Sequence, residues 1–188
     1  MSSIVEHVVL FKLNDDDVDS GKINSMVNGI NELVNLDQVL HLYCGSIHRL
    51  ITTTASDFTH VLHSRIRIDS EDIMAVDWIA DQAPETLAPP PCSIGKITLL
   101  KLKENVMEEA KLEIMEVMKE KFEGIDQITV GENFSPGRSK GFSIGSISYF
   151  RDLGEIEAVD DQMKLQNDKI RDYVDDTIVV EFNVPSSS

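Results

Sequence analysis

The sequence predicts an α+β protein built from two tandem βαββαβ units, the ferredoxin-like arrangement. Two observations lead to this prediction. The segment "IVEHVVLFKL" at 4–13 returns as "GKITLLKLKE" at 95–104. The same order of apolar patterns then follows each segment, which indicates that the chain contains two copies of one fold. The repeated residues are Phe11, Lys12 and Leu13 in the first segment, and Leu100, Lys101 and Leu102 in the second.

The first half opens with a predicted strand over 4–13, because its nearly unbroken apolar run is typical of a strand covered on both faces. A helix is predicted next, with Asp19 or Ser20 as its N-cap. A strand over 39–47, a Thr/Ser loop and an alternating strand over 58–68 follow. The apolar stripe of the helix has the spacing of one helical face: Ile23, Met26, Val27, Ile30, Leu33 and Val34.

The acidic segment 69–82 predicts a second helix in the first half, with Asp69 or Ser70 as cap. The segment after it is short and rich in proline, so the first unit has no obvious fourth strand. Either a short edge strand lies there or the first half is incomplete. The second half predicts strands at 94–102, about 128–134, 142–150 and 177–184, helices at about 106–122 and 154–173, and a loop at 135–141.

The proline-rich segment 88–93 is the predicted boundary, because prolines neither continue a helix nor sit in a central strand. We therefore expect copy 1 at 1–87, a linker at 88–93 and copy 2 at 94–185. Short matches support the repeat, among them "AVD" at 75–77 and at 158–160.

Net charge, the length of apolar runs and cysteine spacing exclude several classes of protein. The 188 residues carry a formal net charge of −16, which repels nucleic-acid backbones and anionic lipid surfaces, so we expect neither as a partner. No apolar run is long enough for a membrane helix, and the N-terminus lacks a secretory signal pattern. We expect a cytoplasmic protein, or an organellar one if a targeting segment precedes this chain. Cys44 and Cys92 lack the spacing of a zinc site or a disulfide framework.

The segments "VEHVVLFK", "GINELVNLDQV" and "FTH" resemble the stress-responsive α/β-barrel domain, a plant-abundant branch of the dimeric α+β barrel proteins. The resemblance covers nearly the whole chain as two copies. It implies that the two units close one dimeric-type α+β barrel within the chain, with helices outside. We therefore expect a monomer with an internal pseudo-dimer, because each half covers the sheet edges of the other. Further oligomerisation stays open.

The resemblance implies a role in stress response or plant defence, without enzymatic activity and with a barrel cavity for a small apolar ligand. One alternative is a polyketide-cyclase-like enzyme that uses His7 as base, since His7 occupies the family's first-strand histidine position. A second alternative is a structural oligomerisation module.

Other candidate site residues come from the same resemblance. Lys96 takes the first-strand histidine position in copy 2. The family resemblance includes a polyketide cyclase that uses a tyrosine and two histidines around its second helix. Aligning 78–84 with that segment places Trp78 at the tyrosine, and Asp81 and Pro84 at the two histidines. His60 alternates with apolar neighbours, so we expect it to line the barrel interior with His7. The expected ligand-binding residues are His7, His60, Trp78 and Lys96, although a histidine on an apolar strand is more often part of the core.

Relatives also hold a divalent cation at the turn after the first helix. Carried over to this chain, the site corresponds to Val34, Asp37 and Leu40. Backbone carbonyls and one carboxylate suit a hard ion such as Mg²⁺. No other cofactor is expected.

Overall fold

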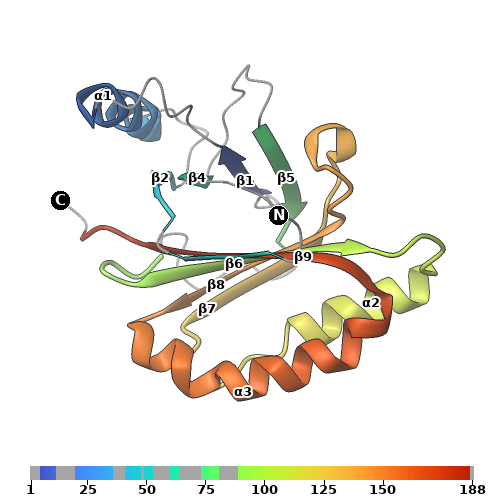
Figure 1. The fold of residues 1–188 in the computed structure, drawn as a ribbon. Helices are drawn as coiled ribbons and strands as arrows, with labels where there is room; N and C mark the ends of the chain where they lie inside the picture. Colours follow the sequence, from blue (N-terminus) through green and yellow to red (C-terminus); the bar gives the residue numbers. More distant parts are fainter. Residues whose placement is uncertain are drawn as a thin grey trace.

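The computed structural model describes residues 5–11, 20–35, 41–47, 49–52, 60–63, 73–80 and 89–186. Two antiparallel sheets pack face to face (Figure 1). Sheet A has the order β2-β4-β1-β5, and sheet B the order β3-β9-β6-β8-β7. The strands of sheet A are β1 (Val5–Phe11), β2 (Tyr43–Ser46), β4 (His60–His63) and β5 (Ile73–Ile79). Those of sheet B are β3 (Arg49–Thr52), β6 (Ile94–Leu102), β7 (Gln127–Glu132), β8 (Ile144–Phe150) and β9 (Val174–Asn183).

Helices cover the outer faces of both sheets. In Figure 1, α2 and α3 lie on the side of sheet B away from sheet A, and α1 lies beyond sheet A. Alternation along each strand produces this layering, because successive side chains point to opposite faces. The helical segments are α1 (Ser20–Asn31), η2 (Glu32–Asn35), α2 (Glu108–Met118), η3 (Pro136–Arg138), α3 (Leu153–Ile170) and η4 (Arg171–Tyr173).

The main core lies between the two sheets. Val8 and Leu10 of β1 belong to the same buried cluster as Ile97 and Leu99 of β6. Their neighbours Val9 and Phe11 instead pack against α1. Each half therefore contributes one wall of a shared interior, and burial of this apolar surface holds the halves together. The described residues of this inner cluster also include Met74, Val76, Trp78, Phe142, Ile147, Tyr149, Ile178, Val180, Phe182 and Val184.

The two sheets are joined at both sides. β3, from the first half, pairs with β9 of the second half. At the other side Trp78 and Asn133 form an isolated antiparallel bridge. Phe134 N donates to Asp77 O at 3.0 Å, and Asp77 N donates to Asn133 Oδ1 at 3.1 Å. These bonds close the barrel and leave fewer unpaired strand edges.

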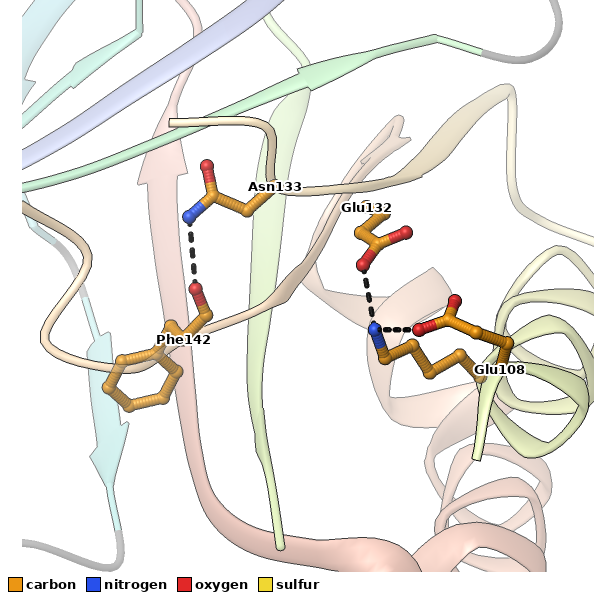
Figure 2. A network of polar contacts seen from close by, with 5 residues as sticks. Glu108, Glu132, Asn133 and Phe142 are labelled. Carbon is orange, nitrogen blue, oxygen red and sulfur yellow. Dashed lines mark hydrogen bonds and ion pairs between the residues drawn. The ribbon is translucent and has the colours of Figure 1, made fainter. Parts of the chain in front are cut away.

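Asn133 anchors this second junction. Its Nδ2 donates to Phe142 O at 3.0 Å, as Figure 2 shows. Beside it, Lys111 of α2 forms ion pairs with Glu108 at 2.7 Å and Glu132 at 3.0 Å, which connect α2 to the end of β7 (Figure 2).

Most predicted elements are confirmed, including the doubled α+β fold. The strand predicted over 94–102 has the same bounds as β6. In the helix predicted after the first strand, Met26, Val27 and Ile30 pack on the outer cluster of sheet A. In the helix predicted at about 106–122, Ile114 and Met118 are buried, but Met107 is exposed.

The helix predicted over 69–82 is wrong, because β5 occupies Ile73–Ile79 and pairs with β1 along its whole length. β5 is the fourth strand of sheet A, whose existence the sequence left open. The "AVD" at 75–77 lies in a strand, whereas the "AVD" at 158–160 lies in a helix, so this sequence match is a coincidence.

β3 was also missed. The sequence predicted a loop after 47, but residues 49–52 form a strand of sheet B. Its partner β9 lies far away in the sequence, so no local pattern signals the pairing.

Candidate functional site

Each half carries a basic and an acidic residue paired across its first and last strands. His7 of β1 lies opposite Asp77 of β5, and Lys96 of β6 lies opposite Glu181 of β9. In the first pair, His7 Nδ1 contacts Asp77 Oδ1 directly. Both side chains of that pair are mostly buried. The repeated register makes these two pairs the equivalent positions of the two copies.

His7 lies on the outer face of sheet A. Val8 and Leu10 point into the core between the sheets, so alternation puts His7 on the α1 side with Val9 and Phe11. The expectation that His7 lines the barrel interior is therefore wrong.

The structure does not test whether the His60 side chain lies beside His7. Its backbone pairs with Phe11 and Ser46, and its side chain lies outside the described part of the structure.

Trp78 lies in the core between the sheets, fully buried. It packs against two glycines of the second half. A Cβ at Gly131 would come within 2.8 Å of Trp78 Cδ1, and a Cβ at Gly145 within 2.6 Å of its Cε3. Trp78 thus occupies a strand rather than the helix position that the resemblance assigned to it. Asp81 and Pro84, the other residues of that alignment, lie outside the described residues.

Lys96 lines a groove of about 400 Å³ on the outer face of sheet B. The groove lies between the sheet and the two helices α2 and α3. Thr98, Ser146 and Ser148 add hydroxyl groups to its floor. Apolar atoms make up the larger part of the groove surface, although polar and charged residues also line it. Its apolar side chains include Leu100, Met118, Phe122, Ile128, Met163, Ile170 and Val179.

The surroundings of Lys96 change its acidity. Burial lowers the pKa of the Lys96 amine below its usual value, against the opposing effect of the Glu181 and Asp160 carboxylates, while Arg49 lowers it further. Lys96 Nζ donates to Met163 Sδ at 3.2 Å. A thioether is a weak acceptor, so this contact satisfies the amine poorly.

Glu181 is the acidic partner in this region. Its side chain is 1% exposed, and neither carboxylate oxygen has a hydrogen-bond partner among the described residues. Arg49 Nη1 lies 3.7 Å from its Oε1. Because Arg49 belongs to β3, the first half supplies a charge to the site of the second half. Ile51 of the same strand, 44% exposed, also lines the groove.

The predicted cation site is only partly visible. Val34 lies in η2, while Asp37 and Leu40 lie outside the described residues. Within the described part of the chain, no group of three or more His, Cys, Asp or Glu side chains is placed to hold a metal ion. The Mg²⁺ site stays a prediction.

Sequence reasoning named His7 and Lys96 but missed Asp77, Glu181 and Arg49. These three residues are defined as partners only by strand register. A weak signal was available: an acidic residue interrupts an otherwise apolar run in both 73–79 and 177–184.

In the described residues, no helix combines the length and apolar character needed to cross a membrane.

The architecture is that of an α+β barrel of the dimeric type, closed by two related halves of one chain. The family "Stress responsive A/B Barrel Domain" matches residues 5–79 and 94–184. This chain therefore belongs to the stress-responsive A/B barrel domain family, with two copies of the domain. The membership supports a stress-related role.

Two proteins of Arabidopsis thaliana are similar along the whole chain. Stress-response A/B barrel domain-containing protein DABB1 is 85% identical, and the alignment covers 100% of each protein. That alignment spans 210 positions, more than the 188 residues of this chain, so some positions of the relative have no counterpart here. A second stress-response A/B barrel domain-containing protein of the same plant is 58% identical over 100% of this chain and 81% of its own length.

Solved structures share the fold at low sequence identity. A putative chlorite dismutase, TA0507, aligns with a TM-score of 0.60 and 14% identity, covering 95% of this chain and 94% of its own. A putative monooxygenase from Fusobacterium nucleatum aligns with a TM-score of 0.59 and 14% identity, covering 96% and 91%. These likenesses concern the fold alone.

Proposed function

We propose that this chain is a non-enzymatic stress-response protein that binds a small apolar ligand in the groove between sheet B and helices α2 and α3. The observation that carries the proposal is the groove itself. Its volume of about 400 Å³ is within the range of ligand pockets, roughly 300 to 1,000 Å³. Apolar atoms make up the larger part of the groove surface, as they do in most ligand pockets.

The groove replaces the barrel interior as the proposed binding site. The space between the sheets contains large, fully buried side chains, including Trp78, Phe182 and Ile97. Tyr43 and Phe182 stack there with ring centroids 4.7 Å apart. A ligand between the sheets would have to displace this packing, whereas the groove is already open.

Thermal unfolding with a panel of neutral aliphatic and aromatic compounds tests the proposal. A ligand that prefers the folded state raises the midpoint of unfolding. We expect stabilisation of the wild type and its loss in Thr98→Phe, which fills the groove. Leu112→Phe is the matched control, because Leu112 is exposed on α2 and is not part of the groove. If no compound in the panel stabilises the wild type, the proposed binding function is wrong.

A second candidate function has one observation in its favour. The contact between His7 and Asp77 resembles the arrangement in which a carboxylate orients a histidine base. This keeps the polyketide-cyclase-like alternative open. Trp78, however, points to the opposite face of sheet A and cannot act on a substrate held at His7. A cyclase needs both a base and a donor for the developing oxyanion.

The cyclase alternative is tested with a linear tetraketide. We expect product formation by the wild type to equal the background without protein. The comparison variant is His7→Ala. Turnover by the wild type that disappears in this variant would establish the enzyme and contradict the non-enzymatic proposal.

A further inference from the structure

We propose that Lys96 forms an imine with an aliphatic aldehyde held in the groove, which makes this groove a site for reactive carbonyl compounds. The proposal rests on the proposed function, because it uses the same groove, and it names the chemical class of the ligand. It depends on the position of Lys96, on the partners of its amine and on the charges around it.

The position of Lys96 is favourable for a reaction with a bound ligand. It contributes to the polar side of the groove, while apolar atoms make up the larger part of the groove surface. Its described hydrogen bond goes to the thioether of Met163, a weak acceptor that a ligand can displace. An aliphatic chain can therefore occupy the apolar part while its single polar group meets the amine.

The surroundings of Lys96 favour the neutral, nucleophilic form of its amine. Burial lowers the pKa of Lys96, which increases the fraction in the neutral form that attacks carbonyl carbon. The charged groups around it are Glu181 on β9, Asp160 on α3 and Arg49 on β3. Glu181 is the cross-strand neighbour of Lys96 and is buried. Its carboxylate is suited to accept and return a proton during the reaction.

The reaction needs no further reagent. The neutral Nζ attacks the carbonyl carbon, an N–C bond forms, and a proton moves from nitrogen to the carbonyl oxygen to give a carbinolamine. The nitrogen lone pair then forms the C=N bond while the C–O bond breaks. The hydroxyl group takes up one proton and leaves as water. The product is an imine, and the second proton of the amine has gone to the departing water. Nothing is oxidised or reduced.

The charges favour a neutral carbonyl compound over a carboxylic acid. Glu181 lies beside Lys96, and five acidic residues line the groove: Glu120, Asp160, Asp168, Asp175 and Asp176. The other basic residues of the lining, Lys164 and Arg171, already pair with Asp160 and Asp168. The whole chain carries a formal net charge of −16. A carboxylate ligand would face this field, whereas an aldehyde carries no charge and still reacts with the amine.

Reductive trapping tests the inference. The full chain is incubated with nonanal and sodium cyanoborohydride, which reduces an imine to a stable secondary amine, and the modified lysines are identified by peptide mass spectrometry. We expect modification of Lys96 to exceed that of Lys101 by about tenfold, because Lys96 lines the groove and Lys101 does not. Lys101 belongs to the same strand and pairs with Asp175 at 3.3 Å.

Two variants and one control ligand complete the experiment. Lys96→Met removes the amine with little change of shape and should abolish this modification. Glu181→Gln should slow it. The control ligand is 1-nonanol, which fits the same groove but forms no imine. Stabilisation of the wild type and of Lys96→Met by 1-nonanol would show that both are folded with an intact groove.

The outcomes separate the two proposals. If 1-nonanol stabilises the protein but nonanal modifies Lys96 no faster than Lys101, the imine is wrong and the ligand-binding function stands. If neither compound acts at the groove, both proposals are wrong. Preferential modification of Lys96 that is lost in Lys96→Met supports both.

Discussion

At the scale of single residues, the packing of Trp78 depends on glycines of the other half. Gly131 on β7 and Gly145 on β8 leave the space that the indole fills. Because the first half supplies the tryptophan and the second half supplies the glycines, this contact couples the two copies directly.

Gly145→Ala should destabilise the protein by about 1–3 kcal/mol, because the new methyl group would lie 2.6 Å from Trp78 and the core would have to shift. Gly137→Ala is the matched control, since a Cβ there meets nothing within 4 Å. Denaturant unfolding of both variants measures the difference. Equal free energies of unfolding for the two variants would contradict the packing argument.

The two cysteines should differ in reactivity. Cys44 is buried, and burial raises the pKa of its thiol to about 11, so little thiolate forms at neutral pH. Cys92 is exposed. We expect iodoacetamide to alkylate Cys92 in the native protein and Cys44 only after denaturation, as read by peptide mass spectrometry. Similar native rates at both sites would show that Cys44 is accessible.

At the scale of elements, α3 begins with reciprocal capping contacts. Asp152 Oδ1 accepts from Glu155 N at 3.1 Å, and Glu155 Oε2 accepts from Arg151 N at 2.9 Å. Since α3 forms one wall of the groove, its cap affects both stability and the site.

Asp152→Ala should lower the free energy of unfolding by about 1 kcal/mol, the usual effect of losing an N-cap side chain. Glu157→Ala, on an exposed position of the same helix, is the control and should have little effect. Denaturant unfolding with both variants checks this. A loss in Glu157→Ala as large as in Asp152→Ala would show that the cap is not responsible.

At the scale of the whole molecule, the halves form a single unit. They share the core between the sheets, and β3 crosses from the first half into the sheet of the second. We propose that the protein is a monomer, because each half already provides the partner that a single domain would need.

Light scattering should return the mass of one chain, 21.0 kDa, at micromolar concentration. The chain already pairs β3 with β9 and bridges β5 to the segment after β7, so these junctions need no second molecule. A measured mass of two chains or more would overturn the proposal.

Unfolding should be a single transition for both halves. Trp78 is the one tryptophan of the sequence and reports on the interface, while far-UV circular dichroism reports on all elements. We expect the two signals to change together with denaturant. Separate midpoints would mean that one half unfolds without the other.

Local sequence patterns were sufficient to predict the doubled pattern, the family resemblance and most elements of the second half. These predictions depend on local periodicity. The pattern of residues 94–102, for example, predicted the observed bounds of β6. The sequence also singled out His7 through the family resemblance, and Lys96 as the equivalent position in the second copy. The prediction for residues 73–79 was wrong because a short apolar run fits a strand or a helix. The acidic residues before this run favoured the helix.

Three features could be seen only in the folded molecule: 73–79 pairs with β1, β3 joins the opposite sheet, and His7 faces away from the core. The same holds for the groove and for the pairing of Lys96 with Glu181. Each depends on contacts between residues far apart in the chain. The free energy of such contacts is set by register and by burial against a partner surface, and neither is encoded in the periodicity of a single segment.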